Sequence, residues 1–544
     1  MRSRLALRTA GWVAGLTAAL WMTAGGPAGA ISFANASSSP GAGSWTVYHG
    51  DPAGSGAAAA GRVDTGSRAW TSAALDGEIY GEPLVSAGRV YVATENNTVY
   101  ALSAATGAVA WSRHLATPVP SGSLPCGDIA PTVGITGTPV IDPARGEIFV
   151  VADEVAGGRP AHVLTGLSTS TGQVEMTRDV DPPGADTAAL LQRTGLTLAG
   201  GRVVFGFGGN DGDCATYRGR VVAVPEAGGA PATFTVDAKA GQSQGAVWMG
   251  GAAPAVDAQG DVWVSVGNGS VYQASRGYDD SDSVLDLSPS MRLLQYFAPA
   301  DWAANNSRDL DMSAEPVLLP GGQVLLAGKS PTAYLLNGAH LGGIGGQLAS
   351  LASACNGDID GGAAVTGRTV YLPCVSGIVA VAASASPPGL RLLWRSGTGG
   401  GPPIVAGGLV WTISLTGTLY GLDPQTGQVR QQATIGAVAN HFPTASVGAG
   451  LLLAPAANRV VAFRATGTPG APASTSAAST APPSSAPASS APAAQASAPG
   501  QAGGTDPGSG GLSGGAIAGI VAGGVLLLGG AGWLLWRRAQ ARPS

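Results

Sequence analysis

Charge is scarce in this sequence, and lysine is almost missing. Charged residues make up 11% of the 544 positions, and the formal net charge is −5 at pH 7. Only two lysines occur, Lys239 and Lys329, although arginine is common. Proteins that bind nucleic acid usually present a basic surface. The composition therefore disfavours a nucleic-acid partner.

Cysteine and histidine are also few, and the signatures of several enzyme classes are missing. The four cysteines are widely spaced and the five histidines are dispersed, which disfavours a zinc site. No C-x-x-C-H haem motif, G-x-S-x-G elbow, Walker loop or H-E-x-x-H pair occurs. The sequence thus gives no support to covalently bound haem or to hydrolase and nucleotide chemistry. Four cysteines fit an oxidising exterior, where disulfides persist.

Both ends of the chain have targeting features. Residues 1–30 combine a basic start, an apolar stretch and a small-residue cleavage site, which predicts a secretory signal peptide; a retained anchor helix is the alternative. Residues 516–536 form an apolar span long enough for a transmembrane helix, and the arginines after it predict a cytoplasmic tail at 537–544. The Ala/Ser/Pro/Gly-rich stretch 466–511 predicts a disordered stalk. We therefore expect a single-pass protein of the cell membrane with residues 31–465 outside.

The middle of the chain is a series of similar units. Gly88–Trp111 contains three short runs rich in Val, Tyr and Ala, separated by Asn and Gly turns, which is typical of successive antiparallel strands. Looser copies begin at Gly137, Gly195, Ala253, Ala314, Gly362, Pro403 and Thr444. Eight units, at periods of roughly 40 to 60 residues, predict an all-β, eight-bladed β-propeller. A β-sandwich or two smaller domains is the alternative.

The eighth unit lacks its last strand. Ser67–Leu75 precedes the first unit and places Trp70 at the strand position that Trp111 holds. Pairing of this stretch into the eighth blade would close the ring, and closure removes open sheet edges. We therefore expect the N-terminal part of the domain to complete the last blade.

The four cysteines allow three pairings. Cys355 and Cys374 flank the first strands of one predicted blade. We prefer a local disulfide between them. Cys126 and Cys214 would then bridge neighbouring blades.

Two stretches carry a resemblance to a known family. Ala101-Leu102-x-x-x-Thr106-Gly107-x-x-x-Trp111 and the stretch from Gly421 to Gly427 resemble the repeat of the PQQ-type (quinoprotein) β-propellers, where PQQ is pyrroloquinoline quinone. This blade serves quinoprotein dehydrogenases and also non-catalytic outer-membrane assembly scaffolds, so the resemblance implies the fold rather than the activity.

The central units are similar to the dehydrogenases, and most of all to the polyvinyl-alcohol dehydrogenase branch. The stretch 208–225 resembles the segment that supplies a calcium-binding acid before an Arg-Gly turn, which implies Asp213 and Arg218. The stretch 245–270 resembles the segment whose Trp stacks under the quinone and whose Asn reaches calcium, which implies Trp248 and Asn268. The resemblance thus implies PQQ and Ca²⁺ as cofactors, with Arg218 and Trp248 at the quinone.

The same resemblance implies the catalytic residues. The stretch 296–319 is similar to the segment that contains the catalytic Asp, and Asp301 fits best as the base and as a further metal ligand, with Asp309 or Asp311 as rivals. Lys329 stands where the family places a Lys beside the quinone, in a chain that otherwise uses Arg.

Each of these residues has an ordinary structural alternative. Asp213 suits a turn, Trp248 a packing role between blades, Asn268 a left-handed turn, Asp301 a helix N-cap before Trp302, and Lys329 a solvated surface. Two departures from the dehydrogenases also stand: an Asp replaces their usual calcium-binding Glu, and their adjacent Cys-Cys pair is absent.

Two further acidic stretches are weak signals. Asn356-x-Asp358-x-Asp360-Gly361 resembles the start of a calcium loop, but Gly367 stands where an EF-hand needs Glu. Asp279, Asp280 and Asp282 are expected in a solvated turn.

Three functions follow from the sequence. The first is a surface-anchored propeller with a PQQ/Ca²⁺-type pocket that either oxidises an alcohol, with a separate protein or a quinone as electron acceptor, or binds a related ligand. The second is a non-catalytic scaffold that binds envelope proteins or polymers. The third is a surface sensor or adhesin.

Overall fold

The computed structural model describes residues 43–466. The predicted signal peptide, stalk, membrane helix and tail lie outside these residues, except for Thr466, which ends the last strand. Between residues 43 and 466 no helix is long and apolar enough to cross a membrane.

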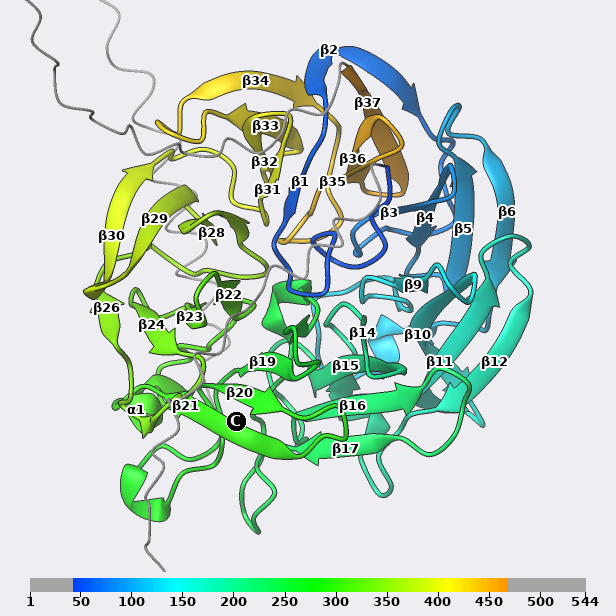
Figure 1. The fold of residues 1–544 in the computed structure, drawn as a ribbon. Helices are drawn as coiled ribbons and strands as arrows, with labels where there is room; N and C mark the ends of the chain where they lie inside the picture. The colour runs from blue at the N-terminus through cyan, green and yellow to red at the C-terminus, as the bar shows by residue number, and fades with distance from the viewer. Residues whose placement is uncertain (1–42, 467–544) are drawn as a thin grey trace, which may run out of the picture. The chain divides into compact units, whose positions relative to one another are not determined.

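Eight four-stranded antiparallel sheets, the blades, are arranged around a common centre (Figure 1). Strands follow one another from the inner to the outer edge of each blade. Blades 1 to 4 consist of β3 (Leu84–Ser86), β4 (Arg89–Ala93), β5 (Thr98–Ser103) and β6 (Val109–His114); β9 (Val140–Asp142), β10 (Glu147–Ala156), β11 (Arg159–Ser168) and β12 (Val174–Asp179); β14 (Thr197–Ala199), β15 (Arg202–Gly209), β16 (Arg220–Pro225) and β17 (Ala232–Thr235); β18 (Ala255–Val256), β19 (Val262–Val266), β20 (Ser283–Leu287) and β21 (Leu293–Ala298).

Blades 5 to 8 repeat this order, and an N-terminal strand supplies the outer edge of the last one. They consist of β22 (Val317–Leu319), β23 (Gln323–Leu326), β24 (Ala333–Asn337) and β26 (Ala349–Leu351); β27 (Ala364–Thr366), β28 (Thr369–Cys374), β29 (Gly377–Ala385) and β30 (Pro388–Arg395); β31 (Ile404–Ala406), β32 (Leu409–Ile413), β33 (Thr418–Leu422) and β34 (Val429–Thr434); β35 (Ser446–Gly448), β36 (Leu451–Ala456), β37 (Arg459–Thr466) and β2 (Arg62–Thr71). The prediction of an eight-bladed propeller is confirmed.

Short elements join or extend the blades. They are β1 (Ala57–Ala58), β7 (Val119–Pro120), β8 (Thr132–Val133), β13 (Leu190–Leu191), β25 (Gly343–Ile344), the helix α1 (Trp302–Asn306) and the 3-10 turns η1 (Ser121–Ser123), η2 (Thr187–Ala189), η3 (Met249–Gly251) and η4 (Ala274–Arg276).

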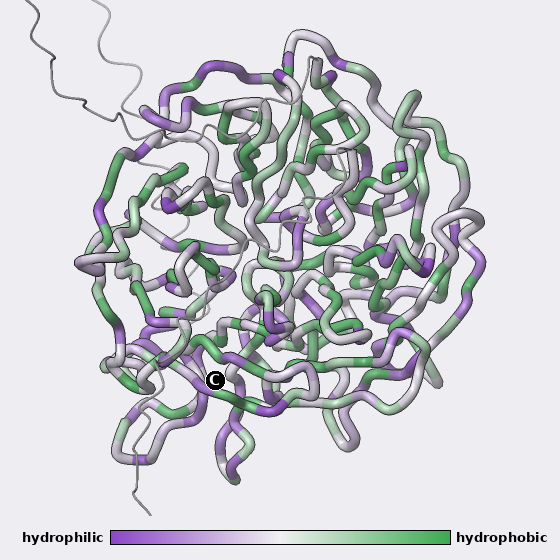
Figure 2. The backbone as a smooth tube through the Cα atoms, viewed as in Figure 1, coloured by the Kyte–Doolittle hydropathy of each residue, from purple (hydrophilic) through white to green (hydrophobic). Residues whose placement is uncertain are grey.

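Hydropathy explains the layering of each blade. Middle strands such as β4 and β19 are almost wholly buried, whereas the outer strands β12 and β34 alternate between exposed and half-buried residues. Figure 2 shows the hydrophilic residues of β34 at the rim. The apolar inner strands therefore pack between blades, and the outer strand faces water on one side.

Strand β2 closes the ring as predicted. It pairs antiparallel with β37, with Arg62 opposite Thr466 and Trp70 opposite Ala462. The first and last parts of the domain thus share one blade, and β2 forms its outer edge strand.

A tryptophan on the outer strand links a blade to the next one at three junctions. The indole N–H of Trp70 donates to Ala104 O at 2.8 Å, that of Trp111 to Thr169 O at 2.9 Å and that of Trp394 to Pro424 O at 3.0 Å. Gly107 lies under the first of these rings with a φ of +72°, and a Cβ there would come within 2.5 Å of Trp70. The spacing of Thr-Gly and Trp in the repeat is therefore a contact between blades.

The segment before β2 runs along the inside of the ring, which the sequence does not predict. Its backbone bonds reach the inner strands of five blades, through the pairs Trp45–Val85, Ile141–Thr46, Val256–Pro52, Val365–Ser55 and Val405–Gly56. β1 also pairs in parallel with β31 of blade 7. Residues 43–58 consequently tie together blades 1, 2, 4, 6 and 7, which are not all neighbours in the ring.

Both preferred disulfides are present. Cys355, between blades 5 and 6, pairs with Cys374 at the end of β28. Cys126, between β7 and β8, pairs with Cys214, in the loop between β15 and β16 of blade 3. The first bond is local, as predicted, and the second reaches across from the blade 1–2 connection to blade 3.

Removal of the Cys126–Cys214 disulfide is expected to cost more stability than removal of Cys355–Cys374. The two bonds span 88 and 19 residues, and chain entropy in the unfolded state gives about 4.5 and about 3 kcal/mol for such loops. Chemical denaturation of the two double Cys→Ala variants measures the difference. An equal loss in both variants would contradict the loop-length argument.

Candidate functional site

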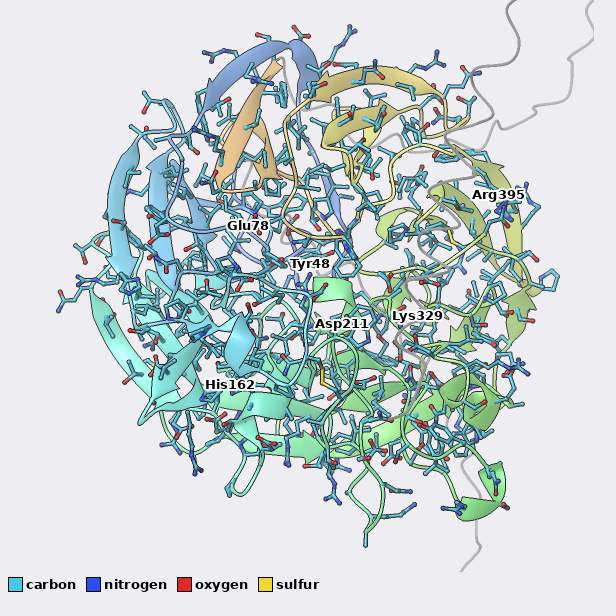
Figure 3. All side chains as sticks on the ribbon, turned by 180° about the vertical axis from the view of Figure 1, so that it is seen from behind. Tyr48, Glu78, His162, Asp211, Lys329 and Arg395 are labelled. Carbon is cyan, nitrogen blue, oxygen red and sulfur yellow. A yellow bond between two sulfur atoms is a disulfide. The ribbon has the colours of Figure 1, made fainter. Side chains whose placement is uncertain are left out.

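Lys329 lies near the middle of the ring, whereas Arg395 lies at its rim (Figure 3). Lys329 follows strand β23, and its backbone N–H donates to Asp311 O at 2.8 Å. A Cβ on Gly328 would lie 2.1 Å from that same oxygen, so only glycine lets the two segments approach this closely. The local sequence Gly-Lys therefore fixes the lysine against the Asp311 segment.

The ammonium group of Lys329 is paired with two carboxylates. Its Nζ lies 2.6 Å from Asp311 Oδ2 and 3.2 Å from Asp309 Oδ1, and its side chain is 18% exposed. Burial opposes the charge, but the attraction of Asp311 and Asp309 outweighs it and raises the pKa of Lys329. The lysine is thus a fixed cation and not a solvated surface group.

Trp248 contacts Lys329, and Asn268 contacts Asp311. Lys329 Nζ lies 5.5 Å from the centre of the Trp248 ring, which is within cation–π range. Asp311 Oδ1 accepts the backbone N–H of Asn268 at 2.6 Å. Within the described residues the buried Asn268 Oδ1 has no hydrogen-bond partner. Trp248 precedes η3, Asn268 follows β19 and Lys329 follows β23, so three segments of blades 3 to 5 converge here.

An aromatic row continues from Trp248. Its ring lies 5.9 Å from that of Phe442, and the guanidinium of Arg193 lies 5.2 Å from Phe442 and 5.6 Å from Tyr80. All three aromatic side chains are half-buried. Two aromatic side chains, Trp248 and Phe442, therefore lie between the cations Lys329 and Arg193.

Asp360 is a further carboxylate near Lys329. Its Oδ1 is buried and has no hydrogen-bond partner within the described residues. Burial raises the pKa of Asp360 to about 7, against the opposing attraction of Lys329. We define the Lys329 cluster as Trp248, Asn268, Asp309, Asp311, Lys329 and Asp360.

Part of the chain matches the model of a known family. The family model of the outer membrane protein assembly factor BamB matches residues 18–134 and 60–280. The matched stretches include blades 1 to 3 and two of the tryptophan junctions. The chain is a PQQ-type β-propeller. No curated protein sequence matches it.

Solved structures of similar fold include three dehydrogenases. They are the quinohemoprotein alcohol dehydrogenase ADHIIG of Pseudomonas putida HK5 (TM-score 0.57, 14% identity, covering 79% of this chain and 82% of that one), the quinohemoprotein alcohol dehydrogenase of Comamonas testosteroni (0.57, 15%, 78% and 80%) and a europium-containing methanol dehydrogenase (0.55, 14%, 76% and 89%). At these identities the likeness shows the fold alone.

Of the residues predicted for the site of this propeller, Trp248, Asn268 and Lys329 come together. Asp301 begins helix α1, is exposed and makes no side-chain capping bond. Asp311, named as its rival, contacts both Lys329 and Asn268. The helix was foreseen, but the geometry favours Asp311 over Asp301 for a role in the cluster.

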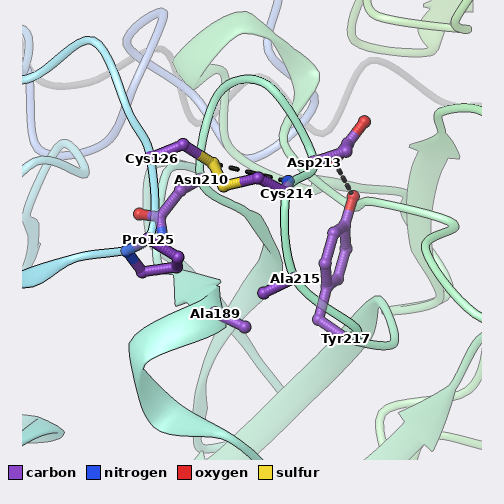
Figure 4. A pocket seen from close by; sticks show the side chains of 8 residues that line it. All are labelled: Pro125, Cys126, Ala189, Asn210, Asp213, Cys214, Ala215 and Tyr217. Carbon is purple, nitrogen blue, oxygen red and sulfur yellow. Dashed lines mark hydrogen bonds between the residues drawn. A yellow bond between two sulfur atoms is a disulfide. The ribbon is translucent and has the colours of Figure 1, made fainter. Parts of the chain in front are cut away.

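Asp213 and Arg218 have other partners. Asp213 Oδ1 accepts the hydroxyl of Tyr217 at 2.7 Å, beside the Cys126–Cys214 bond, in a small hollow (Figure 4). Arg218 donates to the backbone oxygens of Gln242 and Lys239. From residue 43 to 466 no group of three or more His, Cys, Asp or Glu is arranged to hold a metal ion.

The expectation that the Asp279–Asp282 turn is solvated is wrong for its two end residues. Asp279 is 1% exposed and Asp282 is 0% exposed. Asn306 of α1 donates to Ser281 Oγ and to Val271 O, which folds the helix over this turn. The residue types of this segment predict a polar turn, but they do not show that a later segment of the chain covers that turn.

Sequence reasoning missed Asp360 as a member of the cluster. The Asp-x-Asp-Gly pattern drew attention to it only as a failed calcium loop. Its proximity to Lys329 arises because blade 6 begins next to η3: a Cβ on Gly250 would lie 2.2 Å from Gly361 N. A contact between blades 3 and 6 has no signature in either segment.

Asp360 gives a pH-dependent stability. Its pKa is about 7 when folded and 3.8 for the unperturbed group, so the protonated form is favoured by folding. This contribution is complete below about pH 4 and is lost as the pH rises through about 7. We expect the wild type to lose about 1–3 kcal/mol relative to Asp360→Asn over that range, as measured by urea denaturation. A constant difference across the range would refute it.

Proposed function

We propose that the Lys329 cluster binds a planar quinone cofactor of the PQQ class and supports oxidation of an alcohol. The observation that carries the proposal is a half-buried lysine held 2.6 Å from a carboxylate and 5.5 Å from the centre of a half-buried tryptophan ring. A flat apolar ring beside a fixed cation suits a flat ligand with electron-rich oxygens. The dehydrogenases of similar fold support the same class of chemistry.

The residues fit the quinone better than they fit calcium. Trp248 would contact the flat face of the cofactor, Lys329 its oxygens, and Asn268 Oδ1 is available to a further polar group. Calcium needs six to eight oxygens. Both oxygens of Asp311 are already engaged, by Asn268 and Lys329, and Asp213 is bonded to Tyr217. These side chains do not form a calcium shell.

The chain's own residues have distinct roles in this proposal. When bound, the quinone would supply the acceptor for two electrons and a proton. Asp311 positions Lys329 and the Asn268 backbone, and Lys329 provides positive charge where negative charge develops. Asp360, with a pKa of about 7, can accept a proton at neutral pH, as a general base must. Electrons would pass on to a separate acceptor.

Titration of the purified full-length protein with PQQ tests the proposal. We expect a saturable change in PQQ absorbance and a higher melting temperature, first without and then with Ca²⁺. Dye-linked oxidation of primary alcohols and of polyvinyl alcohol then measures activity. If PQQ changes neither the absorbance nor the melting temperature, with or without Ca²⁺, PQQ is excluded as the cofactor. Binding without dye reduction would leave a quinone-binding protein that is not a dehydrogenase.

A scaffold that binds envelope proteins or polymers is the second candidate. The match to the BamB assembly-factor model favours it, because that family description names assembly rather than catalysis. Crosslinking in cells followed by affinity purification tests it. A partner that is retained by Lys329→Met would support a scaffold surface separate from the cluster. A surface sensor or adhesin would instead be indicated by loss of attachment to surfaces in a deletion strain.

We also propose that the propeller is exported and held at the membrane. The composition of residues 1–30 and 516–536 supports this. Fractionation of cells that express the full chain or a chain ending at residue 511 tests it. Equal recovery of both forms in the membrane fraction would count against the anchor.

A further inference from the structure

Arg193 is buried and forms no ion pair with any residue between 43 and 466. It follows β13, and only 8% of its surface is exposed. Within residues 43–466 its guanidinium makes no hydrogen bond, and no carboxylate lies within 4.0 Å of it; its contacts are the rings of Tyr80 and Phe442. A buried charge without a hydrogen-bonding counter-ion is costly. The arrangement is therefore incomplete as it stands.

Specific hydrogen bonds and a glycine shape the surroundings of Arg193. Asn440 donates to Tyr80 O at 2.8 Å and accepts from Phe442 N at 2.6 Å, so one side chain holds both ring-bearing segments together. Gly251 has a φ of +84°, and a Cβ there would lie 2.7 Å from Arg193 Nη1. The space for the guanidinium thus exists because this position is glycine.

Nearby acids do not complete the site. Glu95 and Asp128 attract Arg193 only from a distance. Glu95 Oε2 accepts hydrogen bonds from Gly134 N at 2.7 Å and Thr136 Oγ1 at 3.1 Å, whereas Oε1 has no hydrogen-bond partner within residues 43–466. Burial raises the pKa of Glu95 to about 8, so this group is largely neutral at pH 7. The positive charge of Arg193 is left for a ligand.

We propose that Arg193 forms an oxyanion-binding subsite for a carboxylate or phosphate group, at the far end of the aromatic row from Lys329. A guanidinium binds either group through two parallel hydrogen bonds. Phe442 lies between Arg193 and Trp248, so a ligand with a planar ring carrying the anion would contact both the charge and the row. The subsite has its own cation and goes beyond the proposed quinone site.

Anion binding to the full-length protein tests the subsite. The probes are terephthalate, a flat aromatic dicarboxylate, and inorganic phosphate, with affinity measured by calorimetry. We expect Arg193→Gln to weaken binding of one or both by about tenfold or more. Arg202→Gln is the matched control, since Arg202 lies in the same blade and donates to Ala223 O; its affinities should equal those of the wild type.

Phe442→Leu separates the two sources of the anion. If terephthalate binds more weakly to both Arg193→Gln and Phe442→Leu, the ligand is a carboxylate carried on a ring. If phosphate binding depends on Arg193 but not on Phe442, the ligand is a free anion.

Thermal melting shows whether the variants fold. Without anion, Arg193→Met should be at least as stable as the wild type, and phosphate should raise the melting temperature of the wild type only. Equal affinities in wild type and Arg193→Gln, or no binding to either, would overturn the subsite. PQQ titration of Arg193→Gln tests binding at Lys329 independently of the anion measurements. If this variant still binds PQQ but the anions do not bind, the Arg193 subsite is overturned and the quinone proposal is not.

Discussion

Replacement of Trp70 by alanine is expected to lower the free energy of unfolding by about 3–5 kcal/mol, the usual cost of truncating a buried tryptophan. Trp70 is 9% exposed, and its indole packs on Gly107 and donates to Ala104 O of blade 1. It stands on β2, the strand that completes blade 8. The loss therefore falls on the junction where the two ends of the ring meet. Denaturation of the purified protein in guanidinium chloride measures it.

Two comparisons give this prediction its meaning. Trp111 makes the same contact between blades 1 and 2, which are already joined by the chain, so Trp111→Ala should destabilise less. Tyr272 is 55% exposed, and Tyr272→Ala controls for the loss of a surface ring. If Trp70→Ala costs no more than Tyr272→Ala, the ring does not depend on this contact for closure.

Replacement of Lys329 by methionine is expected to weaken PQQ binding by roughly 10- to 100-fold, because a charge-assisted contact is removed. It should also destabilise the fold by about 3–5 kcal/mol, the cost of breaking a buried ion pair. The substitution leaves the carboxylate of Asp311 without its cation at 2.6 Å, beside the buried oxygen of Asp360. Absorbance titration and chemical denaturation give the two values.

The chain contains its own control for this experiment. Lys239, the second of the two lysines, donates to Tyr278 O outside the cluster. Lys239→Met should leave PQQ affinity unchanged. Lys329→Met combined with Asp311→Asn should recover part of the lost stability, because the unpaired carboxylate is gone. Equal PQQ affinity in the two lysine variants would place the ligand elsewhere.

The blades could be predicted because their signals are local. Short apolar runs, an Asn-containing turn and the Thr-Gly to Trp spacing lie within one unit of the chain, as in Gly88–Trp111. The closing strand followed from the same logic, since Trp70 repeats the position of Trp111. The inner segment 43–58 has no such pattern. Its bonds to five blades depend on where those blades already are.

The site was only partly predictable for the same reason. The family resemblance placed Trp248, Asn268 and Lys329, which do converge. It preferred Asp301 to its rival Asp311, ten residues further on, although only packing shows that Asp311 is the one that contacts Lys329. Asp360 stood out only as part of a failed calcium loop, and Arg193 had no signal. Each acquires its environment from blades distant in sequence.

By itself the sequence determined the all-β repeat architecture, the number of blades and the strand that closes the ring, and it favoured the two disulfides among three possible pairings. These features rest on periodicity and on residue types that act within one unit or at a repeated junction. Only the tertiary structure decided which side chains share the middle of the ring. There Lys329 gains Asp311 and Trp248, Asp360 is buried, and Arg193 is enclosed by rings without a counter-ion. Burial and charge pairing are properties of neighbours, and the neighbours here come from segments far apart in the chain.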